Sequence, residues 1–131
     1  MIASASETTT LGVKVRVEPE YLPDHSNPAQ SLWVHAYHVT ITNESEQVLQ
    51  LVWRQWIITN ANGTEERVSG PGVVGQQPVL KPGERFEYTS GCPLDTAVGT
   101  MHGSYRMVKP DGEHFEATIA PFTLAEPFAL N

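Results

Sequence analysis

The sequence predicts an all-β domain, folded as an antiparallel β-sandwich of the immunoglobulin or fibronectin type III kind. Short runs in which apolar and polar residues alternate recur along the chain, as in half-buried strands. The 10 glycines and 10 prolines fall mostly between these runs, where turns are expected. No window carries a sustained apolar repeat of about 3.6 residues, which an amphipathic helix requires. About seven short strands with frequent turns are typical of two packed antiparallel sheets.

The N-terminal region is expected to comprise a flexible leader, residues 1–11, followed by one domain, residues 12–131. The leader is rich in serine and threonine and has no alternating apolar pattern. Immediately after it, Val13, Val15 and Val17 alternate with charged residues. This alternation predicts the first half-buried strand.

Two longer strands are expected in the first half of the chain. Residues 21–30 contain two prolines, an aspartate and an asparagine, so they are predicted to form a loop. A strand is then predicted within residues 32–42, where aromatic and β-branched side chains recur at every second position. After polar turn residues at 43–47, the β-branched and aromatic stretch 48–59 predicts a long strand.

Turn residues divide the second half into shorter strands. Residues 60–63 read Asn-Ala-Asn-Gly and predict a hairpin turn. Residues 82–83, Pro-Gly, and 110–112, Pro-Asp-Gly, mark two further turns. The remaining strands are expected at residues 64–68, 85–89, 104–108 and 114–119, with a short edge strand within 122–130.

Composition disfavours several classes of protein. The chain has 131 residues and 8 Lys plus Arg against 15 Asp plus Glu, so its formal net charge is −7. Nucleic-acid binding is not expected, because it depends on clustered basic side chains. No apolar run approaches the roughly 20 residues of a membrane-spanning helix, and no signal peptide is recognised at the N-terminus. The single cysteine, Cys92, cannot form an internal disulfide, so a cytoplasmic location is predicted.

A glycine-spaced loop is the most distinctive local motif. Gly70, Gly72 and Gly75 form the pattern G-x-G-x-x-G. This pattern binds a dinucleotide only where a helix follows, and the prolines and β-branched residues here leave no room for one. One interpretation is that the glycines supply positive φ in a tight turn. The other is that their N–H groups, with Arg54 or Arg67, bind a pyrophosphate-like anion.

No catalytic residue, metal site or cofactor is predicted. Cys92 lies between a glycine and a proline without a neighbouring base in the sequence, so it is not expected to be a nucleophile. His35 and His38 are three residues apart on an expected strand, so they should point to opposite faces and cannot chelate one ion. Glu65 and Glu66 should alternate faces for the same reason, which argues against an acid and base pair.

The strand expected at residues 48–59 would have two apolar faces under strict alternation. One face would carry Leu49, Leu51, Trp53 and Ile57, and the other would carry Val48, Val52, Trp56 and Ile58. A sandwich buries only one face of each sheet, so the second face needs a cover. The cover could be a protein partner or a second copy, with a candidate surface of Val52, Arg54, Trp56 and Ile58. Alternatively, the loop 21–30 covers this face, or a β-bulge shifts the alternation.

Four ordered blocks of sequence resemble a known family. They are Arg54 with Trp56-Ile57-Ile58-Thr59; Gly72-Val73-Val74-Gly75-x-Gln77-Pro78-Val79-Leu80-x-Pro82-Gly83-Glu84; Tyr88-Thr89-Ser90-Gly91; and Gly99-x-Met101-x-Gly103-x-Tyr105-x-Met107. Together, over residues 12–127, they resemble the ApaG family. The resemblance implies an immunoglobulin-like or fibronectin type III-like sandwich and bacterial relatives linked to cobalt and magnesium homeostasis. It also implies eukaryotic relatives whose similar domain accompanies an F-box or belongs to a polymerase-associated protein.

The resemblance implies no established catalytic activity, and the chain departs from the family pattern at two positions. Gln55 stands where many relatives have His, and Asn60 where Asp is common, which weakens any metal role for those positions. We therefore predict a non-enzymatic protein-interaction module with an unidentified protein partner, as a monomer or homodimer. The alternative prediction is weak binding of pyrophosphate or nucleotide anions at the glycine loop.

Overall fold

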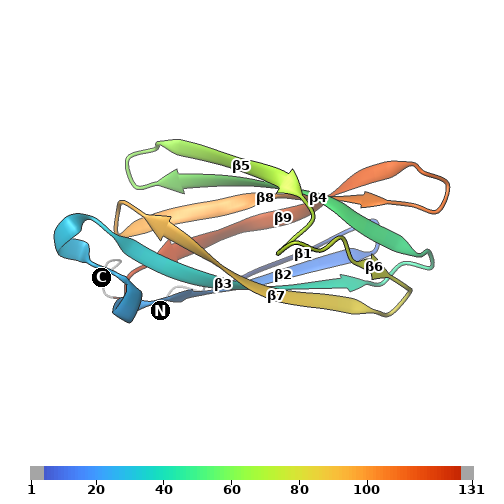
Figure 1. Cartoon of the computed structure of the whole chain (residues 1–131), viewed down its shortest axis with the longest axis horizontal. Coiled ribbons are helices and arrows are strands. Elements are labelled where there is room, and N and C mark those ends of the chain that lie inside the picture. Colours follow the sequence, from blue (N-terminus) through green and yellow to red (C-terminus); the bar gives the residue numbers. More distant parts are fainter. Residues whose placement is uncertain (1–4, 128–131) are drawn as a thin grey trace.

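A computed structural model describes residues 5–127 and shows two antiparallel sheets packed face to face (Figure 1). This confirms the predicted all-β sandwich. One sheet has the strand order β1-β2-β3-β7, and the other has the order β5-β4-β8-β9 with β6 also paired to β4. The strands are β1 Ser6–Thr10, β2 Val13–Tyr21, β3 Trp33–Asn43, β4 Leu49–Asn60, β5 Glu65–Pro71, β6 Val79–Leu80, β7 Arg85–Leu94, β8 Val98–Val108 and β9 His114–Ala125. Two 3₁₀ turns, Pro23–His25 and Pro28–Gln30, lie in the predicted loop.

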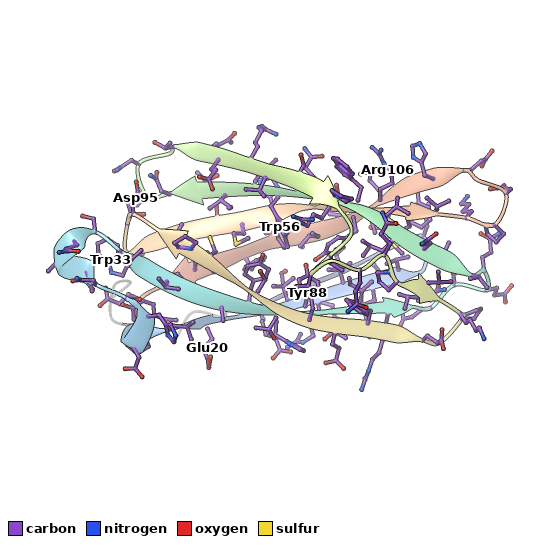
Figure 2. All side chains as sticks on the ribbon, in the orientation of Figure 1. Glu20, Trp33, Trp56, Tyr88, Asp95 and Arg106 are labelled. Atoms are coloured by element: carbon purple, nitrogen blue, oxygen red, sulfur yellow. The ribbon has the colours of Figure 1, made fainter. Side chains whose placement is uncertain are left out.

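The core lies between the two sheets and follows the alternation of the sequence. In β2 the three alternating valines are buried and the charged residues between them face outward. Four aromatic rings stack edge-on or tilted across the centre: Tyr37, Trp56, Tyr105 and Phe122. Aromatic pairs in such arrangements add about 0.5–1.5 kcal/mol to the burial of their area. Figure 2 places Trp56 between the two sheets.

The expected flexible leader is wrong for residues 6–10, which form strand β1 against β2. The side chain of Ser6 donates a hydrogen bond to the carbonyl of Ala120, 2.8 Å away. The N–H of Thr118 donates to the hydroxyl of Thr10 at 3.1 Å. Strands β1 and β9 therefore close one side of the sandwich. The start of the leader, residues 1–4, lies outside the described residues.

The C-terminal edge strand expected within residues 122–130 is also corrected. Residues 122–125 continue β9 across an irregularity in its pairing with β8, where the register shifts between Met101 and Gly103. The remaining part, residues 128–130, lies outside the described part of the chain. A long strand interrupted by such an irregularity is hard to recognise from alternation alone, because the alternation changes phase.

Strand β4 contains the β-bulge that was one of the alternatives for residues 48–59. Its register with β8 shifts between Leu51 and Trp53, so Val52 is the extra residue. Strict alternation is therefore wrong beyond this point. Trp56 is only 3% exposed and belongs to the core, whereas Trp53 is 37% exposed on the outside. The predicted uncovered outer face with Trp56 at its centre does not exist.

Among residues 5–127, no helix is long and apolar enough to cross a membrane.

Candidate functional site: a slot between strands β5 and β7

The side of the sandwich opposite β1 and β9 is open. There β7 ends one sheet and β5 ends the other, each with a neighbouring strand on one side only. Two adjoining pockets, of about 310 and 230 Å³, lie between these edges. They share Ile58 from β4, Glu66 from β5 and Pro93 from β7, so they form one continuous depression. We call it the β5–β7 slot.

The bulge in β4 determines which side chains reach the slot. After Val52 the inward positions of β4 are Arg54, Trp56 and Ile58, and all three line the slot. These three residues belong to the predicted partner surface, and the structure brings them together on the inner face of the sheet. The fourth predicted residue, Val52, does not line the slot. The register partners of the three lining residues on β5 are Gly70, Val68 and Glu66, in the same order.

The floor of the slot is aromatic and apolar. Trp56 lies with its ring centroid 5.2 Å from that of Tyr37, in an edge-on arrangement. Tyr37 and Met101 also line this part of the slot and are buried. Val68, at the mouth, is 38% exposed. The slot therefore has a rigid, packed floor and an apolar side chain accessible at its rim.

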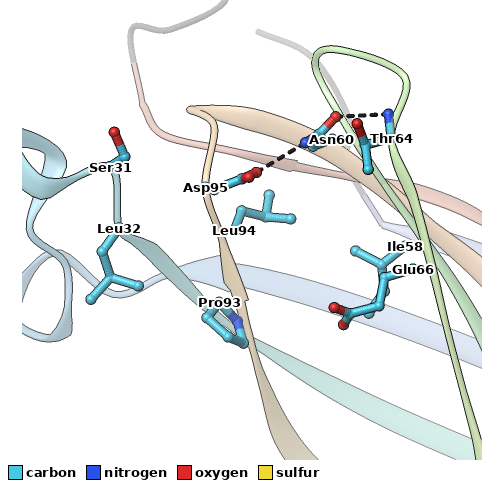
Figure 3. Close-up of a pocket in the computed structure, with 9 residues that line it drawn as sticks. All are labelled: Ser31, Leu32, Ile58, Asn60, Thr64, Glu66, Pro93, Leu94 and Asp95. Atoms are coloured by element: carbon cyan, nitrogen blue, oxygen red, sulfur yellow. Dashed lines mark hydrogen bonds between the residues drawn. The ribbon is translucent and has the colours of Figure 1, made fainter.

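The far end of the slot is polar and acidic. Figure 3 shows Glu66 extending from β5 toward Pro93 on β7, with Ile58 beside it. Asn60 donates a hydrogen bond from Nδ2 to a carboxylate oxygen of Asp95 at 3.0 Å, and this contact joins the two sheets. The Oδ1 atom of Asn60 accepts a hydrogen bond from the N–H of Thr64 at 2.9 Å. These bonds close one end of the slot.

Arg54 closes the other end by binding the glycine loop. Its Nη1 atom donates to the carbonyl oxygens of Pro71, at 3.0 Å, and Gly72, at 3.1 Å. A Cβ atom at position 70 would lie 3.2 Å from both guanidinium nitrogens Nη1 and Nη2. A side chain at position 70 would therefore have to displace the guanidinium. The loop presents carbonyl oxygens to Arg54, and these bonds fasten the loop to the sheet.

The glycine loop itself is a tight turn. Val74, Gly75 and Gly72 have positive φ, at 43°, 79° and 63°. The backbones of Val73 and Gln76 exchange two hydrogen bonds of 2.8 Å, and the N–H of Gly72 donates to the carbonyl of Val52 at 2.9 Å. Three N–H groups of the loop thus already have protein acceptors. The turn interpretation is thus confirmed for Gly72 and Gly75, whereas Gly70 lies in β5 without a positive φ. Anion binding stays a prediction.

Arg67, the second candidate for anion binding, is not brought together with Arg54. Its register partner is Ile57, so it points to the outer face of the sheet, whereas Arg54 points inward. It is exposed and donates from Nη2 to a carboxylate oxygen of Glu65 at 3.3 Å. Glu65 and Glu66 lie on opposite faces, as the alternation predicted.

Cys92 has a histidine neighbour that the sequence did not reveal. His35 on β3 is its register partner, and both side chains are buried on the inner face. Burial lowers the pKa of His35 to about 4. Burial, with a smaller effect of the Glu66 carboxylate, raises the pKa of Cys92 to about 11. Both groups are thus neutral near pH 7, which is the opposite of the charged pair that activates a nucleophilic cysteine.

The histidines offer no obvious chelating set. His35 and His38 lie on opposite faces of β3, as predicted, and Nδ1 and Nε2 of His38 lie 2.9 Å from the Thr89 hydroxyl and the Glu87 carboxylate. Within residues 5–127, no three His, Cys, Asp or Glu side chains are grouped closely enough to hold a metal ion.

Comparison with known proteins identifies the family. The sequence profile of the ApaG domain matches residues 23–109. The chain belongs to the ApaG family. ApaG proteins similar to it include Protein ApaG of Acidovorax sp. (strain JS42), 56% identical over 112 residues that cover 86% of this chain and 82% of that protein. Protein ApaG of Dechloromonas aromatica is 49% identical over 126 residues, 96% of this chain and 99% of the relative.

Solved structures agree with this assignment. The putative ApaA protein from Bordetella pertussis superposes with a TM-score of 0.86 at 47% identity, covering 97% of this chain and 100% of that one. The C-terminal domain of wzt superposes with a TM-score of 0.55 at 11% identity, over 92% of this chain and 77% of that one. At that identity the likeness concerns the fold alone. The family resemblance inferred from the four sequence blocks is confirmed.

Proposed function

We propose that this ApaG protein is a non-catalytic recognition module and that the β5–β7 slot binds a segment of another protein. The observation that carries the proposal is the form of the slot: a packed aromatic floor, a polar rim, and a position between the free edges of two sheets. Binding sites are typically concave and apolar with a few polar groups at fixed positions. Free sheet edges are also where extended peptides add to β proteins.

The chemistry of the slot supports a binding role over catalysis. Cys92 lines the slot, but burial keeps its thiol protonated and His35 beside it neutral. A thiol attacks a substrate as the thiolate, which this environment disfavours. The exposed carboxylates of Glu66 and Asp95 are suited to polar contacts at a rim.

The experiment that tests this proposal places a photo-crosslinking amino acid, p-benzoylphenylalanine, at Val68 in the slot. Val79 is the matched control, because it is also an exposed valine on an edge segment of the same sheet but lies outside the slot. In an extract of the host cell, irradiation should yield discrete adducts from position 68 and none from position 79. Equal yields from both positions, or no adduct from position 68, would contradict the proposal. The link to cobalt and magnesium homeostasis would gain support if the captured protein handles these ions.

The second candidate is weak binding of pyrophosphate or a nucleotide at the glycine loop, supported by its run of glycines beside Arg54. Two facts weigh against it: three loop N–H groups already donate to carbonyls, and Arg54 donates to two loop carbonyls. Titration with pyrophosphate, followed by NMR, tests it directly. Saturable shifts confined to the amides of Gly70, Gly72 and Gly75 would support the anion site, and unmoved amides would remove it.

A further inference from the structure

We infer that the occupant of the β5–β7 slot is an extended segment that places a large apolar side chain over Trp56 and a lysine or arginine against Glu66 and Asp95. This inference rests on the proposed function and specifies the chemistry of the partner. It follows from the separation of an apolar region and an acidic region along the same slot.

The apolar region is the part between Arg54 and Ile58. Trp56 forms its floor with Tyr37 and Met101, and the Trp56 ring is held edge-on by Tyr105 and Phe122 beneath it. Because these rings are packed in the core, the floor needs no rearrangement to receive a side chain. Burial of one large apolar side chain there would favour binding.

The acidic region is the part between Ile58 and Asp95. The ionisable groups that line this pocket are Glu66 and Asp95, both acidic. Arg54 is the cation of the neighbouring pocket, and it lies at the opposite end, bound to the loop carbonyls. A basic side chain placed in this pocket would therefore be attracted by both carboxylates and would meet no basic group in the lining. The formal net charge of −7 would further favour the approach of a basic segment.

The length of the slot suits an extended segment. It runs along β4 from Arg54 to Asn60, which is roughly 20 Å at a rise of about 3.3 Å per residue. An extended chain of about six residues spans the same distance. In such a chain, side chains two residues apart point the same way. An apolar residue and a basic residue separated by one residue would thus both enter the slot.

The position of Glu66 is also typical of a charge that protects a sheet edge from aggregation. Natural sheets place inward-pointing charges on edge strands to prevent edge-to-edge aggregation. Glu66 is an inward-facing charge on the edge strand β5, so it could serve that purpose alone. Under that reading its neutralisation would cause self-association and leave peptide binding unchanged.

The test is selection of a displayed random heptapeptide library on wild-type protein. The peptides that are enriched should carry a large apolar residue within about two positions of Lys or Arg. Their affinity should fall about threefold to tenfold in the double variant Glu66→Gln/Asp95→Asn, the range expected for two partly exposed ion pairs. Glu65→Gln is the control, because it removes one carboxylate from the outer face of the same strand, which is half of the charge change in the double variant. A similar fall for Glu65→Gln would overturn the inference, and so would self-association of the double variant with unchanged binding.

A slot-filling variant distinguishes failure of this inference from failure of the proposed function. Ser90 lies on the inner face of β7 opposite Tyr37 and lines the apolar region, so Ser90→Leu should occupy it. Its circular dichroism spectrum and melting temperature verify that it folds. Acidic or uncharged peptides that bind wild type and not Ser90→Leu would overturn the inference and leave the slot as a binding site. If no peptide is enriched on wild type, or if every enriched peptide binds Ser90→Leu equally well, both the inference and the proposed function are overturned.

Discussion

The guanidinium of Arg54 lies directly across the backbone of Gly70, so that a Cβ atom at position 70 would approach Nη1 and Nη2 to 3.2 Å. Arg54 also holds the carbonyls of Pro71 and Gly72. A side chain that the sequence offered as an anion-binding or partner-binding group therefore also organises the end of the slot and the start of the glycine loop.

Gly70→Ala should destabilise the protein by about 1–2 kcal/mol, because the methyl group displaces a guanidinium that is held by two hydrogen bonds. Gly91→Ala is the matched control, since a Cβ atom there meets its nearest neighbour, the carbonyl oxygen of His35, at an ordinary 3.6 Å. Urea unfolding measures both. In an Arg54→Ala background the cost of Gly70→Ala should largely disappear, and an unchanged cost would show that another contact is responsible.

Gly72→Ala should be more damaging than Gly75→Ala. Both glycines have positive φ, which costs an L-residue about 1–2 kcal/mol. Only at position 72 would the added Cβ also collide with the Gln76 carbonyl oxygen. In thermal unfolding, Gly75→Ala should therefore lose about the stability expected from its positive φ alone, and Gly72→Ala should lose considerably more. Equal melting temperatures would contradict the described turn.

Trp56→Ala should cost about 3–5 kcal/mol, as expected for removal of a large core aromatic side chain. Trp53→Ala should cost much less, because Trp53 is 37% exposed beyond the bulge. Comparing the two variants in urea unfolding tests directly which side chains of β4 face the core after the bulge. A larger loss for Trp53→Ala than for Trp56→Ala would place the bulge elsewhere.

The stability of the protein should fall as the pH is lowered from about 6.5 toward 4 because of His35. Its pKa in the folded state is about 4, below its ordinary 6.5, so the unfolded chain binds the proton first. The stabilisation is therefore present above pH 6.5 and is lost progressively toward pH 4, by up to about 3 kcal/mol. Urea unfolding across this range measures the loss.

His35→Leu isolates the contribution of His35 from the titration of the carboxylates. The difference in unfolding free energy between wild type and His35→Leu should change with pH only within this window. His38→Gln, which alters an exposed histidine on the same strand, is the control. A pH-independent difference for His35→Leu would show that His35 is protonated as readily in the folded as in the unfolded state.

The sequence predicted the sandwich because local alternation specifies which residues face the core. It missed β1 because Ser6–Thr10 has no apolar alternation and is held through bonds to β2 and β9. The bulge at Val52 could be raised only as an alternative, since apolar residues continue on both sides of it. The pairing of β4 with β8 determines which residues point inward after the bulge.

The slot was only partly accessible from the sequence. Arg54, Trp56 and Ile58 stood out as an apolar and basic set on one strand, although their face was assigned to the exterior. Glu66 on β5 and Asp95 in the turn after β7 line the same pocket only because the fold brings distant parts of the chain together. The same long-range pairing places His35 beside Cys92, where the linear sequence showed no neighbouring base.

The most direct test of the central claim is an NMR titration of the wild-type protein with a peptide enriched in the selection described above. The account predicts saturable shifts of the amides of Glu66, Val68 and Ser90 along β5 and β7, and unmoved amides at Thr10 and Thr118 on the closed side. Shifts confined to the closed side or to the outer faces of the sheets would contradict the assignment of the β5–β7 slot as the recognition site.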